Sequence, residues 1–167
     1  MLVGKFEGRL DSKNRVTVPQ RLRETRADGG MVCLWSQFYL TLGAEGCIFV
    51  YTPQVWQRLM EEIGATKPLA DDCMRTVQRL VAAHADLREC DGQGRIVLSD
   101  ELRAHANITR EIIFLGACSR AEIWDKDRWI AYSRQNISQL GEKMDMVSRA
   151  GLALPERVDP GRKGPQA

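Results

Sequence analysis

The sequence has few residues of the kinds that build catalytic or metal sites. Only two histidines, His84 and His105, occur in 167 residues, and neither stands beside a candidate nucleophile. The five cysteines are scattered, and no pair has the C-x-x-C spacing of a zinc site. The sequence also lacks a glycine-rich phosphate loop and a G-x-S-x-G nucleophile elbow. We therefore expect a protein that is not an enzyme, with no metal, no cofactor and no small-molecule substrate.

Long apolar runs are missing as well. No run reaches the roughly 18–20 residues that a membrane span needs. At the N-terminus Lys5 places a charge where a signal peptide has its apolar stretch. The hydrophobic content of 44% is ordinary for a globular chain. These features predict a soluble cytoplasmic protein that does not bind membranes, with thiols buried or half-buried in a reducing compartment.

The net charge of +2 hides an asymmetry along the chain. Residues 1–26 carry seven basic and three acidic side chains, a net of +4. Residues 85–104 carry three basic and five acidic side chains, a net of −2. Only the first segment is therefore suited to face a polyanion.

These two segments are copies of each other. The sequence D-S-K-N-R-V-T-V at 11–18 aligns with D-G-Q-G-R-I-V-L at 91–98, at an offset of 80 residues. A second block, 49–56, aligns with 122–129 at an offset of 73. Two matching blocks in the same order indicate a duplication. The first copy holds seven extra residues, which we expect within Arg26–Leu42.

Each copy begins with a predicted hairpin. Asp11–Asn14 and Asp91–Gly94 are polar turns, because Asp, Asn and Gly favour turn conformations. Arg15–Val18 and Arg95–Leu98 are rich in apolar and β-branched residues and predict the return strands.

A short helix is expected after each hairpin, followed by a second hairpin and a longer helix. Pro19 suits the start of the first short helix, through Arg26, and Ser99 suits an N-cap for the second, Asp100–Ala106. The organisation we expect is a first repeat at 1–64 with its hairpin at 3–18, a linking helix within 65–84, a second repeat at 85–140, and a mobile polar tail at 141–167.

The ordered set of motifs resembles the MraZ family over about residues 1–140. The residues that carry the resemblance are D-S-K-N-R at 11–15, D-G-Q-G-R at 91–95 and I-W-D-K-D-R-W at 123–129. Members are bacterial DNA-binding transcription regulators associated with the division and cell-wall gene cluster.

The resemblance implies a mainly β fold with short helices, of the α+β class. Two AbrB-like swapped-hairpin repeats would interlock into a pseudo-dimeric barrel, and protomers would assemble into a ring-shaped homo-oligomer. The duplication has a physical reason, because one hairpin unit of about 45 residues is too small to bury a sufficient core.

The first turn is the expected DNA-reading element. Arg15 suits bidentate contact with guanine, and Lys13 suits phosphate or guanine. Asn14 stands where the family usually has glycine; its amide suits adenine, and Asn tolerates a left-handed turn. Supporting phosphate contacts are expected from three further arginines, Arg9, Arg21 and Arg23, although such a charge cluster is also typical of a solvated helix face.

The two turn pairs allow a structural interpretation too. Asp91 and Arg95 are expected to fix the geometry of the second turn, which has Gln93 in place of Lys13. For Asp11 and Arg15 we expect both roles, with Asp11 orienting an arginine that reaches DNA.

The function expected is a sequence-specific, nucleoid-associated transcriptional regulator, a repressor of its own operon. It would bind short direct repeats in promoter DNA through several N-terminal hairpins of the ring. The alternative is a non-enzymatic protein-interaction module on the same fold, such as an antitoxin-like partner.

Overall fold

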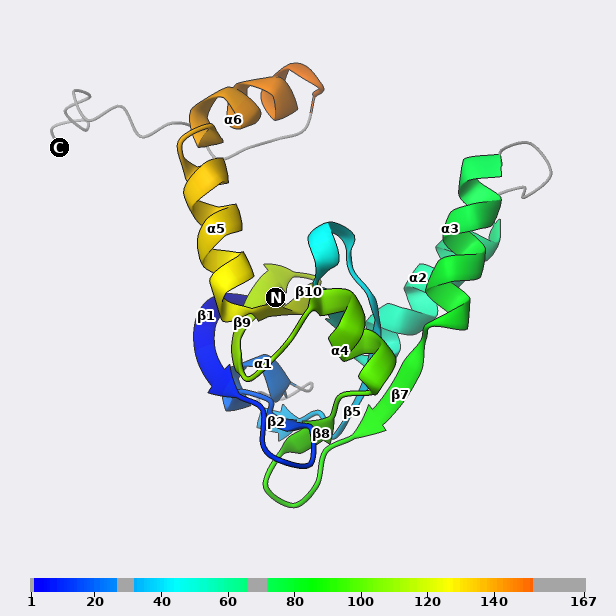
Figure 1. Cartoon of the computed structure of the whole chain (residues 1–167). Coiled ribbons are helices and arrows are strands. Elements are labelled where there is room, and N and C mark those ends of the chain that lie inside the picture. Colours follow the sequence, from blue (N-terminus) through cyan, green and yellow to red (C-terminus); the bar gives the residue numbers. More distant parts are fainter. Residues whose placement is uncertain (1, 27–31, 66–71, 152–167) are drawn as a thin grey trace, which may run out of the picture. The chain divides into compact units, whose positions relative to one another are not determined.

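Antiparallel β-structure forms the centre of the first of two units, residues 1–129, and residues 130–167 belong to the second. The structure is a computed structural model, and it describes residues 2–26, 32–65 and 72–151 (Figure 1). Its strands are β1 (Leu2–Arg9), β2 (Arg15–Thr17), β3 (Glu24–Arg26), β4 (Val32–Leu34), β5 (Gln37–Leu42), β6 (Ile48–Tyr51), β7 (Asp86–Glu89), β8 (Arg95–Val97), β9 (Glu111–Cys118) and β10 (Arg120–Asp125). Its α-helices are α1 (Gln20–Arg23), α2 (Pro53–Ala65), α3 (Asp72–Ala83), α4 (Asp100–Ala106), α5 (Lys126–Ile137) and α6 (Leu140–Arg149), and a 3-10 turn, η1, spans Ala44–Gly46.

The main sheet has six strands in the order β1-β9-β10-β6-β5-β7. Two short ladders, β2–β8 and β3–β4, complete the β-structure of the described residues. The predicted fold class, mainly β with short helices and two interlocked repeats, is confirmed.

The two hairpins are exchanged between the repeats. The local pattern predicted that each return strand pairs with the strand before it, but β2 pairs with β8, and β1 pairs with β9. Only the narrow turn keeps a local bond, from Asp11 N to Arg15 O at 2.9 Å. Exchange lets each return strand bury its apolar face against its counterpart instead of facing solvent.

The register of the exchanged strands obeys a pseudo-twofold axis. Val16 lies opposite Ile96, which is its own counterpart at the offset of 80. In the main sheet Phe49 lies opposite Glu122, its counterpart at the offset of 73. For each sequence offset, one pair of matched residues therefore lies directly opposite each other in the structure.

Both repeats supply one continuous core. Most of the largest fully buried side chains come in matched pairs from the two copies. Three such pairs are Val16 with Ile96, Val18 with Leu98 and Leu22 with Leu102.

The first short helix ends earlier than predicted. It stops at Arg23, and Glu24–Arg26 forms β3, which pairs with β4. This small ladder accounts for most of the seven extra residues, because the offset has fallen from 80 to 74 when Phe38 meets its counterpart Ile112. The second short helix has the predicted bounds, and Ser99 accepts a hydrogen bond from Leu102 N at 3.4 Å.

The predicted tail begins with a helix. Residues 140–149 form α6, in which Leu140, Met144 and Val147 recur at helical spacing. Residues 152–167 of that tail lie outside the described residues.

Candidate nucleic-acid interface

The first turn is organised by the carboxylate of Asp11. Its Oδ1 accepts backbone hydrogen bonds from Lys13 at 2.8 Å and Arg15 at 2.9 Å. Its Oδ2 accepts a hydrogen bond from Nε of Arg15 at 2.8 Å. The backbone hydrogen bond from Arg15 is the main cause that lowers the pKa of Asp11 below its ordinary value. Asp11 therefore stays charged and holds Arg15 in one orientation.

The second turn repeats this arrangement. Oδ1 of Asp91 accepts from Gln93 N and Arg95 N, and Oδ2 accepts from Nε of Arg95 at 2.8 Å. The hydrogen bond from the Arg95 side chain is the main cause that lowers the pKa of Asp91 to about 2. The two turns thus share one design, although only the first carries a lysine.

The left-handed position of the two turns is filled differently. Asn14 has φ 59° and Gly94 has φ 73°, so both residues stand in the region that favours glycine. Asn tolerates this conformation, as expected. Its Nδ2 also donates to Oδ1 of Asp100 on α4 at 3.4 Å.

Four of the six predicted DNA-contacting residues gather at the first turn. Lys13 is exposed at its tip, and the side chain of Arg15 is 28% exposed beside Asp11. Arg9, at the end of β1, pairs with Glu111 at 3.2 Å. Arg9 and Asn14 both line a surface depression next to the turn.

Arg23 lies at the other turn. A Cβ atom built on Gly94 would be only 2.7 Å from Nη2 of Arg23, so the guanidinium covers that glycine. Strand exchange thus places Arg23 beside the second turn rather than the first, and its expected contact with phosphate stays a prediction. Arg21 is an exposed residue of the same short helix.

The sequence reasoning missed two arginines from the second repeat. Arg103 on α4 and Arg110 before β9 line the depression beside the first turn, together with Arg9 and Asn14. A sum of the charges along each copy does not reveal them, because strand exchange brings these residues of the second repeat to the turn of the first. The exchange implied by the family resemblance was the signal that could have identified them.

The surroundings of the two turns differ in charge at three matched positions. Arg9, Lys13 and Arg110 of the first turn correspond to Glu89, Gln93 and Ser36 at the second. The match of Arg110 with Ser36 is supported by equivalent backbone bonds, from Leu10 N and Cys90 N respectively. The neighbouring helices differ in the opposite sense, since α4 has Asp100 and Glu101 where α1 has Gln20 and Arg21.

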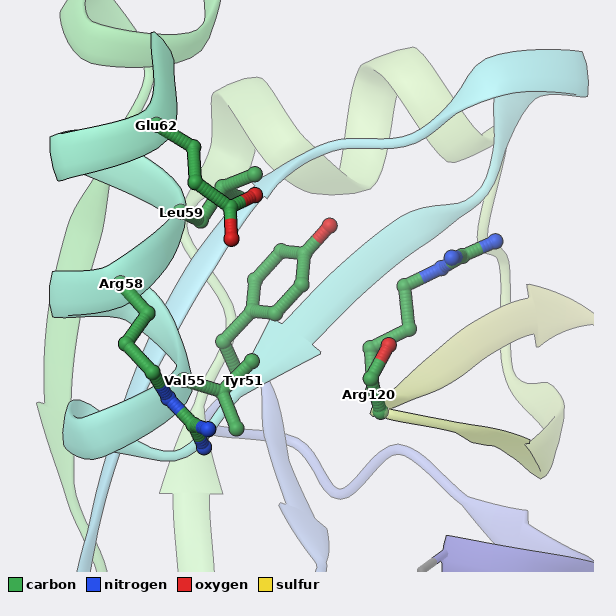
Figure 2. A pocket seen from close by; sticks show the side chains of 7 residues that line it. Tyr51, Val55, Arg58, Leu59, Glu62 and Arg120 are labelled. Carbon is green, nitrogen blue, oxygen red and sulfur yellow. The ribbon is translucent and has the colours of Figure 1, made fainter. Parts of the chain in front are cut away.

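A second pocket lies apart from both turns, between α2 and β6 with β10 (Figure 2). Figure 2 shows Tyr51 between Val55, Leu59 and Glu62 of α2 on one side and Arg120 on the other. The guanidinium of Arg120 pairs with Glu122 at 2.7 Å and lies over the ring of Phe49. The guanidinium of Arg120 therefore already has interaction partners within the fold.

Metal ligands do not cluster in the part of the chain that the structure describes. Of the cysteines with described side chains, Cys47 is buried and Cys90 half-buried, but Cys73 and Cys118 are exposed, contrary to the expectation for all five. Among the described helices, none has the length and apolarity to cross a membrane.

Comparison with known proteins gives the family. The model described as "MraZ protein, putative antitoxin-like" matches residues 1–80 and again 81–149. The chain belongs to the MraZ family. The two matches correspond to the two copies of the duplication, and together they cover almost all of the described structure.

Relatives in the MraZ family cover most of this chain. A protein of Caldanaerobacter subterraneus subsp. tengcongensis is 36% identical over 87% of this chain and 97% of its own length. One of Lachnoclostridium phytofermentans is 33% identical over 92% of this chain and 100% of its own. Both are named "Transcriptional regulator MraZ", and these are names of regulators rather than enzymes.

Proposed function

We propose that this protein is a sequence-specific, DNA-binding transcriptional regulator that reads DNA through the turn at 11–15. The observation that carries the proposal is the first turn itself, where a charged Asp11 holds Arg15 next to an exposed Lys13. The names of the relatives support the same function.

Arg15 is suited to base recognition by its geometry. The hydrogen bond to Asp11 uses Nε, and the Nη groups donate no hydrogen bond within the described residues. A guanidinium with free Nη donors and a fixed plane matches the O6 and N7 acceptors of guanine. Lys13 adds a flexible charge for phosphate or guanine, and the amide of Asn14 suits adenine.

The finer proposal is repression of the protein's own operon in the division and cell-wall cluster, by a ring that binds short direct repeats. Several weakly binding turns on one assembly would supply the affinity. Exposed apolar side chains on α3 and β7, Val77, Leu80 and Leu87, support contact between protomers. Native mass spectrometry tests the assembly. A monomeric protein would contradict the ring.

The test of function is a gel-shift titration with the duplex upstream of the protein's own gene. An unrelated competitor duplex and a salt series are included, because salt sets the affinity of any protein for DNA. We expect a discrete shift that resists the competitor. A shift that any duplex competes away contradicts sequence-specific binding, and no shift favours the protein-interaction alternative.

Two variants separate the roles of the turns. We expect Arg15→Ala to lose the specific shift while keeping its oligomeric state. Arg95→Ala is expected to lower stability more than DNA affinity, since Arg95 fixes the second turn. The control is Arg79→Ala, which removes one exposed charge from α3, a helix that runs away from β2 and β8 (Figure 1). Unchanged operator affinity in Arg15→Ala would contradict the assignment of the first turn as the element that reads DNA.

A further inference from the structure

A basic depression of about 400 Å³ lies beside the first turn. Its lining comes from both repeats. The first repeat supplies Arg9, Asp11, Ser12 and Asn14, and the second supplies Arg103, Thr109 and Arg110. Three arginines on one concave surface offer guanidinium donors suited to an anion with several oxygens.

The carboxylates around this depression neutralise only part of its positive charge. Asp11 is bound to Arg15, and Glu111 is shared between Arg9 and Lys126. Asp100 accepts from Nη1 of Arg103 at 2.9 Å. The Nη2 of Arg103 and the guanidinium of Arg110 form no hydrogen bond with the described part of the chain, so donors remain for a ligand.

Asn14 helps to place Arg103 in the depression. At the second turn the equivalent arginine, Arg23, lies directly over Gly94, where a Cβ atom would collide with it. Asn14 has a Cβ atom, and Arg103 cannot cover the first turn in the same way. It lines the depression instead, with its Nη1 held by Asp100.

We propose that the second repeat completes the DNA-binding surface of the first turn, by supplying Arg103 and Arg110 to a backbone-phosphate site shared with Arg9. This inference rests on the proposed function. The site is one-sided, which means that it lies beside the first turn and has no equivalent at the second. There, Glu89 and Ser36 stand at the positions of Arg9 and Arg110. The duplicated fold thus uses a copy that lacks the reading lysine to hold the DNA backbone next to the copy that has it.

The salt dependence of DNA affinity tests this site. Each phosphate that a protein neutralises contributes about 0.9 to the slope of log affinity against log salt concentration. We expect Arg103→Gln/Arg110→Gln to lower the slope by about 0.9 for each turn engaged. The change should be equal for the upstream duplex and an unrelated duplex of equal length, because phosphate contacts carry no sequence information.

Comparison variants make the result specific. Arg110→Gln alone alters an exposed side chain and keeps its backbone bond to Leu10, so it reports on the site even if the α4 variant unfolds. Arg79→Gln is the charge-matched control, and we expect it to keep the parent slope. Arg23→Gln, the symmetry-related change, is expected to change the slope less than Arg103→Gln.

Three outcomes would overturn the inference. A folded double variant with the parent slope shows that no phosphate is bound there. A loss of preference for the upstream duplex shows base contact instead, and an equal effect of Arg23→Gln shows that the site is not one-sided. If the parent protein binds and Arg15→Ala loses its preference for the upstream duplex, the proposed function stands, and these outcomes count against this inference alone. Failure of the parent to bind any duplex contradicts the proposed function itself.

Discussion

Val16 and Ile96 lie opposite each other in the ladder between β2 and β8, and they are the same position of the two repeats. Both side chains are almost completely buried, with exposed fractions of 1% and 0%. The pseudo-twofold axis therefore passes through the core at a point where neither repeat can shield its own strand. We therefore expect the two repeats to unfold as one cooperative unit.

Truncation at this position should destabilise both repeats together. We expect Ile96→Ala to lower the free energy of unfolding by about 2–5 kcal/mol, because it leaves a cavity in a closely packed core. Urea denaturation should show a single transition at a lower midpoint. Val97→Ala, on the same strand but 40% exposed, is the control and should change stability little. Two separate transitions would show that the repeats fold independently.

The two left-handed turn residues should respond differently to substitution. Gly94→Ala places a Cβ atom at φ 73° and within 2.7 Å of the Arg23 guanidinium, so we expect a loss of about 1 kcal/mol or more. Asn14→Gly relieves the same backbone constraint and should be nearly neutral, since it loses only the long contact to Asp100. Thermal unfolding of both variants gives the comparison. Equal losses would mean that turn strain does not depend on the neighbouring arginine.

Local sequence signals predicted the turns, the return strands and α4, because each depends on residues close in the chain. The expected hairpin pairing was wrong for β2, since nothing within 3–18 distinguishes a strand that folds back from one that crosses to another repeat. Exchange pairs Val16 with Ile96, a contact between residues 80 positions apart that no local pattern contains. The resemblance to a family implied the exchange, but the local pattern did not.

The candidate site shows the same limit. Lys13, Asn14 and Arg15 are adjacent in sequence and could be grouped before the fold was known. Arg103 joins them only through the exchanged strands, and Arg23 leaves them for the same reason. Residues contributed by another repeat can be assigned only when the register between the copies is known.

The reactivity of the thiols should follow their burial. Burial is the main cause that raises the pKa of Cys47 to about 12, so the nucleophilic thiolate is scarce at neutral pH. We expect iodoacetamide to label Cys73 and Cys118 in the folded protein at pH 8 and to leave Cys47 unmodified, as measured by peptide mass spectrometry. Unfolding in urea should expose Cys47 to the reagent. Labelling of Cys47 at the rate of Cys118 in the folded state would contradict the buried position of its side chain.

Acid should destabilise the protein partly through the second turn. The pKa of Asp91 falls from 3.8 to about 2 on folding, so its ionised form stabilises the fold above pH 3.8. That stabilisation should be lost as the pH decreases through this interval towards 2, and thermal midpoints measured from pH 6 to pH 2 should decline. In Asp91→Asn the decline should be smaller, because the group that takes up the proton is gone.

The matched control for acid stability is Asp72→Asn, which removes an exposed carboxylate from α3, outside both turns; a smaller decline in Asp91→Asn than in this control assigns the effect to the turn. Asp11→Asn should reduce the acid decline in the same sense as Asp91→Asn, since folding also lowers the pKa of Asp11. Unlike Asp91→Asn, it should also lose the specific gel shift, because Arg15 would no longer be held by a carboxylate. If both variants keep specific binding, the orientation of Arg15 by Asp11 is not required for reading DNA.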